Sequence, residues 1–320
     1  MPKLSRRTLV TASLAAPALI ATGVYVAPVR AATPTVLPPV ARRKVGRFTV
    51  TVLTDGYLDV PYSTWVGIEG ADLEAMARAG HTHRAHGGMR LSLSTWIVDD
   101  GDRKVLIDAG PGVFAETTGR LPGAMAAIGI APEDIDAVAI THMHFDHIGG
   151  LLDGDRARFP NAELYIDRRD VSFFIDPAEA NAAPDFRKVS FRTSEKVVAA
   201  YKSLQQIDGE REIMRGLSSV DLTGHTPGHT GWRIADGDDS LTIVGDMLFN
   251  PVIHPVRLDV GVAFEPDADA AQQMRRSFVP KAAEEGGLLA ATHMPFPGLG
   301  RVVRDGDTYA WRPAEWDLDA

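Results

Sequence analysis

The 320-residue sequence contains no cysteine. Disulfide bonds, cysteine nucleophiles and thiolate metal ligands are therefore excluded, and histidine and carboxylate side chains remain as the ligands for any metal ion. The sequence also lacks a Gly-x-Ser-x-Gly segment, the turn that presents the serine nucleophile of α/β-hydrolases. Neither of these two covalent nucleophiles is indicated.

Long runs of basic residues are absent as well, and the formal net charge is −9. An acidic chain of this kind is a poor candidate for binding nucleic acid or an anionic membrane. Hydrophobic residues make up 45% of the chain and charged residues 23%, which is ordinary for a globular protein. The expected partner is therefore a small-molecule substrate.

The first 31 residues resemble a twin-arginine export signal. Arg6 and Arg7 precede an uncharged stretch over 8–29, and 29–31 offers small residues for cleavage. A retained membrane-anchor helix is the alternative, but the alanines and two prolines of the stretch make it a weak anchor. Cleavage would remove four basic residues and no acid, taking the formal charge from −9 to −13.

The domain layout follows from this segment. Residues 1–31 are the expected signal, 32–45 are a lead-in rich in proline and alanine, and 46–320 form one domain. The mature protein is expected to be exported, either to the periplasm or out of the cell, with no stable membrane insertion after the signal is removed.

Short apolar runs alternate with helical patterns along the domain. The expected strands are 48–53, 91–98, 104–107, 137–140, 162–166, 220–222, 231–235, 241–244 and 288–291. The expected helices are 71–79, 185–206 and 267–278, the last beginning at Asp267 and ending before Pro280. Strands and helices interleaved in this way indicate an α/β fold in layers.

A histidine-rich cluster follows the expected strand 137–140. His142, His144, Asp146 and His147 lie within six residues, in a chain that has only ten histidines. The cluster lies on the loop that leaves the strand, where His142 and His144 could face one ion while Asp146 and His147 reach a neighbouring one. Surface histidines without a ligand role are the weaker alternative.

Three further groups also stand just beyond expected strands. His229, Asp246 and His293 follow 220–222, 241–244 and 288–291, in that order. Strand ends of an α/β domain gather at one edge of the sheets, so these side chains can converge with the cluster. Asp246 could instead only cap a turn after its strand.

Seven such ligands are too many for one catalytic zinc ion. Shared between two divalent ions, with zinc as the expected metal, they leave room for a bridging water. Asp246 as a bridging carboxylate would hold the ions roughly 3.5–4 Å apart, and the pKa of the water would fall toward about 7. Imidazole and carboxylate also accept manganese or cobalt, so the identity of the metal stays open.

The pattern HxHxDH, then GHTPGH, then GD and a late TH resembles the metallo-β-lactamase superfamily. The resemblance implies an α/β fold, specifically an αββα sandwich in which two mixed β-sheets are flanked by helices. It implies that His142, His144 and His229 bind the first metal ion, that Asp146, His147 and His293 bind the second, and that Asp246 bridges them. It makes His225 a supporting residue and Asp108 a carboxylate that orients the metal loops, although Asp108 could also be a simple turn residue.

Within the superfamily, the sequence most resembles methyl parathion hydrolase-like and N-acyl-homoserine lactonase-like enzymes. The segment 291–300, Ala-Thr-His-Met-Pro-Phe-Pro-Gly-Leu-Gly, carries much of this likeness. True β-lactamases fit less well, because one group uses a cysteine ligand and another lacks the carboxylate found here at Asp246. The resemblance adds a homodimer as the alternative to a monomer.

Several other residues have weaker expected roles. His81, His83 and His86 form a second cluster, interpreted as a flexible loop over the active-site mouth rather than a second metal site. Phe145, between two ligands, is expected near the pocket wall. His254 is either a substrate contact or an ordinary loop histidine.

The predicted reaction is hydrolysis of a lactone, carboxylic ester or phosphotriester by a metal-bridging hydroxide. Asp246 holds the ions, and Asp146 is expected to help move the proton. Alternatives are an iron-dependent oxidoreductase of the same fold acting on a thiol or persulfide, a β-lactamase, or a binding protein without activity. The retention of all seven ligands argues against the last.

Overall fold

A computed structural model of the chain describes residues 38–85, 87–315, 317 and 320. The chain divides after Val36 into two units, and the described residues all belong to the second. The expected signal 1–31 lies outside the described residues. Among the helices that the structure describes, none is both long and apolar enough to cross a membrane.

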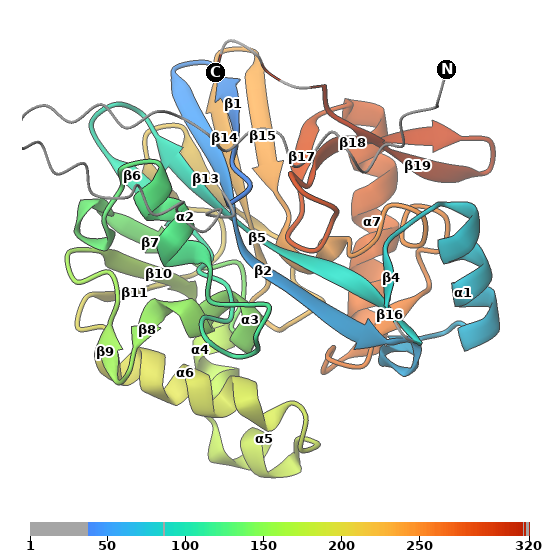
Figure 1. The fold of residues 1–320 in the computed structure, drawn as a ribbon, viewed down its shortest axis with the longest axis horizontal. Coiled ribbons are helices and arrows are strands. Elements are labelled where there is room, and N and C mark those ends of the chain that lie inside the picture. The colour runs from blue at the N-terminus through green and yellow to red at the C-terminus, as the bar shows by residue number, and fades with distance from the viewer. Residues whose placement is uncertain (1–37, 86, 316, 318–319) are drawn as a thin grey trace, which may run out of the picture. The chain divides into compact units, whose positions relative to one another are not determined.

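Two mixed sheets form the centre of the fold (Figure 1). The first has the order β1-β2-β5-β6-β7-β10-β11, with β4 (Arg84–Ala85) also paired to β5. Its strands are β1 (Ala41–Val45), β2 (Phe48–Pro61), β5 (Gly88–Asp99), β6 (Lys104–Ile107), β7 (Ala137–Ala139), β10 (Glu163–Asp167) and β11 (Leu204–Ile207). The strands of the second, in sheet order, are β12 (Glu212–Met214), β13 (Leu217–Asp221), β14 (Thr230–Asp236), β15 (Asp239–Ile243), β17 (Leu288–Ala290), β18 (Leu299–Asp305) and β19 (Thr308–Pro313).

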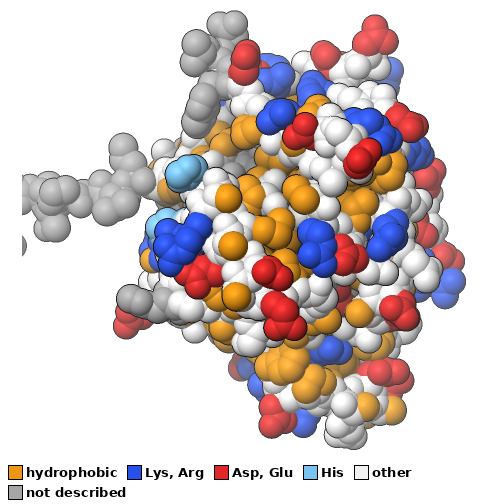
Figure 2. All heavy atoms as spheres, turned by 90° about the vertical axis from the view of Figure 1, so that its right-hand side faces the viewer, with side chains coloured by type: hydrophobic (Ala, Val, Ile, Leu, Met, Phe, Trp, Pro, Cys, Tyr) orange, Lys and Arg blue, Asp and Glu red, His pale blue; other side chains and the backbone are white. Residues whose placement is uncertain are grey.

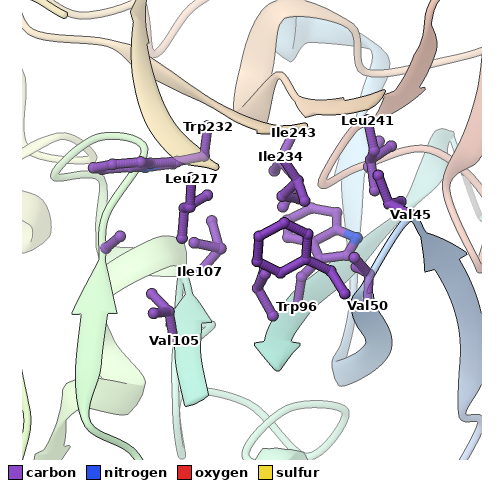
Figure 3. Packing of buried hydrophobic residues seen from close by; sticks show 14 of the residues in the cluster. Val45, Val50, Trp96, Val105, Ile107, Leu217, Trp232, Ile234, Leu241 and Ile243 are labelled. Atoms are coloured by element: carbon purple, nitrogen blue, oxygen red, sulfur yellow. The ribbon is translucent and has the colours of Figure 1, made fainter. Parts of the chain in front are cut away.

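Alternation along the strands decides which side chains fill the space between the sheets. Val105 and Ile107 of β6 face the second sheet, while Leu106 between them packs on the outer side. Figure 3 shows the inner cluster, in which Trp96 of the first sheet and Trp232 of the second are both fully buried. The two sheets are therefore held together by a continuous apolar core.

Helices cover the outer faces of both sheets (Figure 1). On the first sheet lie α2 (Leu121–Ala127), α3 (Phe145–Ile148), α4 (Arg168–Phe174) and α6 (Lys188–Ala200), and on the second lies α7 (Ala268–Glu285). The short helix α5 (Pro177–Ala182) packs against α4, away from the strands. Val171 of α4 and Phe191 of α6 belong to the same buried cluster as Leu106, whereas Val279 of α7 packs with Leu289 of β17. The expected four-layer αββα arrangement is confirmed.

The remaining elements lie outside these layers. Helix α1 (Gly70–Ala79) packs its Leu73 and Ala77 beside the small ribbon of β3 (Trp65–Val66) and β16 (Gly261–Val262). A second ribbon joins β8 (Leu152–Asp153) and β9 (Arg156–Ala157), and short 3₁₀ turns occur at Tyr62–Thr64, Pro132–Asp134, Gly149–Leu151 and Gly245–Met247. On the face that Figure 2 shows, acidic and basic side chains are mixed with apolar ones, so neither sign of charge gathers there.

The long hairpin of β2 and β5 bends at Gly56, where the pairing register shifts. Gly56 has a φ of 131°, and a Cβ at this position would lie 1.9 Å from the carbonyl oxygen of Thr117, so only glycine fits. Just before the bend, the carboxylate of Asp55 accepts three backbone N–H bonds from the loop over 112–121. This bend therefore holds the loop that follows β6.

Among the element boundaries that differ from the sequence expectation, three have a clear physical cause. The first sheet begins at Ala41, inside the expected lead-in 32–45, because Ala41 and Val45 reach the core and the segment pairs with β2. The expected helix 185–206 ends at Ala200, and 204–207 is the edge strand β11, parallel to β10. Its backbone pairing outweighs the local helical pattern.

The third difference is at α7, which begins after the N-cap Asp267 as expected but continues through Pro280 to Glu285. A proline inside a helix removes one backbone hydrogen bond. Here Val279 and Ala282 are buried against the second sheet on either side of it. Packing of this face maintains the helix until Gly286, whose φ of 62° ends it.

Candidate metal centre

The site forms at one rim of the paired sheets, where loops from both meet. Residues 141–144 leave β7, and the short helix α3 starts at Phe145. The backbone N–H of Thr230 donates to the carbonyl of Thr141 at 2.8 Å, and the indole N–H of Trp232 donates to the carbonyl of Ile140 at 3.2 Å. These bonds fix the histidine loop of the first sheet to β14 of the second.

One group of donor atoms gathers around His144. Its Nδ1 lies 2.9 Å from His142 Nε2 and 3.0 Å from His225 Nε2. Asp246 Oδ2 closes the group, 3.3 Å from His225 Nε2 and 3.7 Å from His142 Nε2. A tetrahedral ion with bonds of about 2.0–2.1 Å separates its ligand atoms by about 3.3 Å, so these spacings suit one cation.

A second group consists of Asp146, His147 and His293. Asp146 Oδ2 lies 3.6 Å from His293 Nε2 and 4.0 Å from His147 Nε2. All three come from positions that the sequence predicted as ligands. Asp146 is the most accessible of them, with 16% of its side chain exposed.

Asp246 lies between the two groups. Its Oδ1 is 3.2 Å from His147 Nε2, and its Oδ2 is 3.2 Å from His293 Nε2 as well as near the first group. His147 Nε2 and Asp246 Oδ1 are both buried and make no hydrogen bond. Orphaned buried donors and acceptors are costly unless something else binds them, and a cation between the two groups would do so.

The prediction for His229 is wrong in this structure, and His225 takes its place. His229 Nδ1 donates to the carbonyl of Leu222 at 3.0 Å, and its Nε2 accepts the backbone N–H of Asp246 at 3.1 Å. Both ring nitrogens are thus occupied, and none is left for an ion. The supporting role that the sequence analysis gave to His225 belongs to His229, which holds the backbone of Asp246.

Outer partners orient the remaining rings, as expected for Asp108. Its Oδ2 accepts from His147 Nδ1 at 2.8 Å, and its Oδ1 accepts the backbone N–H of Thr141 at 2.8 Å. Asp108 has a φ of 56°, an uncommon backbone conformation for a residue other than glycine. His293 Nδ1 donates to the carbonyl of Ser92 at 2.8 Å. His147 and His293 therefore both present Nε2 to the centre.

Burial and neighbouring charges set the protonation of the rings. Burial lowers the pKa of His142 and of His144 well below the ordinary value, so both stay neutral at pH 7. The pKa of Asp246 is well below its ordinary value, since the histidines around it, His293 first, outweigh the effect of burial. Against the effect of burial, Asp246 and its neighbouring carboxylates raise the pKa of His147, His225 and His293, so an ion competes with protons for these three rings.

Asp170 is a site residue that the sequence analysis missed. It is fully buried on α4, where its Oδ2 accepts the backbone N–H of Met143 at 2.9 Å and its Oδ1 accepts that of Gly228 at 2.6 Å. Burial raises its pKa to about 6. Asp170 thereby ties the loop of His144 to the loop of His225. No sequence motif marks it, because its partners lie far away along the chain.

The sequence profile described as "Metallo-beta-lactamase superfamily" matches residues 87–293, more than half of the chain. The chain belongs to the metallo-beta-lactamase superfamily. Its structure is similar to that of AidC, described as a dizinc quorum-quenching lactonase, with a TM-score of 0.80 and 25% identity. That match covers 88% of this chain and 99% of AidC.

Two further proteins are similar to this chain in sequence. The N-acyl homoserine lactonase of Bacillus cereus is 25% identical over 179 residues, which cover 49% of this chain and 64% of that protein. Acyl-coenzyme A thioesterase MBLAC2 of Bos taurus is 31% identical over 169 residues, which cover 48% of this chain and 58% of that protein. The matches thus span less than two thirds of the length of these two relatives.

Two cavities adjoin the metal groups of this superfamily member and share His144, Ser190 and Phe264. The smaller one is lined by the metal-group residues Asp146, Asp246 and His293 and by apolar residues that include Phe145, as expected for that residue. The larger one has a volume of about 350 Å³ and runs along α4, α5 and α6. Its apolar lining residues are Phe173, Phe174, Ala182, Ala183, Pro184, Phe191, Pro227, Phe264 and Pro266.

The expected substrate contact of His254 is not supported. His254 is fully buried, lines neither cavity and packs against the rings of Trp65 and Phe249. Its Nδ1 accepts the backbone N–H of Phe249 at 3.2 Å. Burial lowers its pKa to about 3, so it is a neutral structural histidine behind the wall of the smaller cavity.

The second histidine cluster lies apart from these cavities. His81 and His83 are exposed and line neither of them, and they belong to no group of metal donors among the described residues. His86 lies outside the described residues. The interpretation as a loop over the active-site mouth therefore receives no support from the two residues that are described.

Proposed function

We propose that the protein is a hydrolase that depends on two divalent metal ions, with zinc as the expected metal. The observation that carries the proposal is the position of Asp246, whose two carboxylate oxygens reach both donor groups. In this proposal His142, His144 and His225 hold one ion, and Asp146, His147 and His293 hold the other. The similarity to AidC, a dizinc lactonase, supports the number of ions and the metal.

Two such ions would supply Lewis acidity for a carbonyl oxygen and lower the pKa of a water molecule toward about 7. Side chains of the protein would transfer the proton and exclude water. Asp146 is the more exposed of the two donor-group carboxylates that line the smaller cavity, so it can accept and release a proton there. Phe145 and Phe249 line that cavity beside it and limit the access of bulk water.

The lining of the cavities favours a substrate with an apolar group. Besides the residues of the donor groups, the smaller cavity is lined by the aliphatic side chains of Leu58, Val60, Leu91 and Leu93. The larger cavity, with its phenylalanine rings, has room for an acyl or aryl group beside His144. We infer that the scissile bond belongs to a lactone or a carboxylic ester.

A substrate panel on metal-replete protein tests this proposal. The protein is stripped with a chelator, reloaded with zinc and assayed on N-acyl lactones of several chain lengths, aryl esters and a phosphotriester. We expect turnover of lactones or esters that is lost on stripping and restored by zinc. No turnover of any lactone or ester would overturn the proposal, and one iron per chain together with oxygen consumption would favour the oxidoreductase alternative.

We also propose that the protein is exported by the twin-arginine route. The support is the sequence pattern of residues 1–31. A metal centre built from loops of both sheets needs a completed fold, and a route that carries folded proteins suits this requirement.

A further inference from the structure

Glu265 is a buried carboxylate that lies behind His225, on the side away from the other metal groups. It follows strand β16, and only 3% of it is exposed. Its Oε1 lies 3.4 Å from His225 Nδ1, while His225 Nε2 points at His144 and Asp246. A carboxylate and an ion would thus occupy the two nitrogens of one ring, a recurring arrangement at metal sites.

Arg275 of α7 locks this carboxylate in place. It is 1% exposed, and it donates to Glu265 Oε1 at 2.6 Å and to Oε2 at 3.4 Å. The backbone N–H of Val262 donates to Oε2 at 3.2 Å. A Cβ on Gly261 would lie 2.4 Å from Oε2, so the chain makes room for the carboxylate with a glycine.

Burying such an ion pair is costly, and well-packed apolar residues would often replace it without loss of stability. Stability alone therefore does not explain the presence of the buried Glu265–Arg275 pair. Within the described part of the chain, the pair contacts the metal centre through His225, the histidine to which the sequence analysis gave only a supporting role. The comparable rings have simpler partners, since His147 uses Asp108 and His293 uses a backbone carbonyl.

We propose that Glu265, held by Arg275, is a positioning residue that fixes the ring of His225 with Nε2 toward the metal ions. This role rests on the proposed function. A hydrogen bond from Nδ1 to Glu265 leaves Nε2 as the ring nitrogen available to an ion and stops the ring from turning. Through Arg275 the position of one ligand is linked to helix α7, which otherwise packs on the outer face of the second sheet.

The test compares Glu265→Gln with the double variant Glu265→Leu/Arg275→Met. Zinc affinity is measured by competition with a chromophoric chelator, and the melting temperature of the metal-free protein is measured separately. The single variant leaves Arg275 without its ionic partner and should melt at a lower temperature. The double variant removes both charges and should recover the melting temperature.

Zinc affinity distinguishes a positioning role of Glu265 from a purely structural one. If Glu265 positions His225, the double variant binds one zinc ion about 10- to 100-fold more weakly despite its recovered stability. The His225 Nδ1–H resonance of the zinc-loaded protein should also move in Glu265→Gln. Asp59→Asn, which breaks an exposed ion pair with Arg90, is the control and should leave zinc affinity unchanged.

Two failures can be told apart. Equal zinc affinity in wild type and double variant would overturn the role of Glu265 while the proposed function stands. Failure of the wild type itself to bind zinc would overturn the proposed function, and the positioning role with it.

Discussion

Alanine variants of His225 and His229 should show which of these two histidines is the metal ligand. His225→Ala removes one of the four donors of the first group, the Nε2 that lies 3.0 Å from His144 Nδ1. Loss of an outer partner of a ligand weakens metal binding by about 10- to 100-fold. Loss of the ligand itself should exceed about 100-fold, or roughly 3 kcal/mol.

His229→Ala should act on folding instead. It leaves the carbonyl of Leu222 and the backbone N–H of Asp246 without their partner. An unsatisfied buried group costs about 1–3 kcal/mol, so the two together should lower the free energy of unfolding by about 2–6 kcal/mol. The protein should still bind two zinc ions, because no donor atom of either group is removed.

Zinc per chain and melting temperature decide between these outcomes. Each variant is loaded with zinc, passed through a buffer that contains a weak chelator, and analysed for metal. We expect about one ion per chain for His225→Ala and two for His229→Ala, whose metal-free form melts at a lower temperature. The reverse pattern, with His225→Ala retaining both ions and His229→Ala losing one, would refute the assignment.

Three further predictions follow from buried or lining residues and from the first segment. The pKa of Asp170 is raised from 3.8 to about 6, so its contribution to stability is full below pH 3.8 and is lost as pH rises through 6. From pH 4 to 7, the free energy of unfolding by urea should therefore fall by about 3 kcal/mol more in the metal-free wild type than in metal-free Asp170→Asn. The same pH dependence of this free energy in both proteins would contradict the prediction. Phe264→Ala should lower kcat/KM for a long-chain acyl lactone by about tenfold or more and that for a short-chain lactone much less, because Phe264 lines both cavities; an equal loss for both would argue against an acyl group in the larger cavity. Replacing Arg6 and Arg7 together by lysine should keep a fused reporter in the cytoplasm, and undiminished export would contradict the twin-arginine proposal.

The sequence alone determined the fold class and most of the site. Apolar runs of strand length mark the core because they must be buried, and a polar residue just after such a run lies at a sheet edge. This is why Asp246 and His293 could be assigned from sequence, and why the compact cluster from His142 to His147 stood out.

Only the tertiary structure decided which of the two neighbouring histidines, His225 or His229, faces the metal centre. Both are histidines of one loop, so only their contacts with residues far away in the sequence distinguish the ligand from the structural histidine. The carbonyl of Leu222 and the backbone of Asp246 bind the ring of His229, whereas Glu265 and Asp170 hold His225 and its loop toward the centre. Such partners come together only when the two sheets pack, since hydrogen bonds between residues far apart in the chain leave no periodic trace in the sequence.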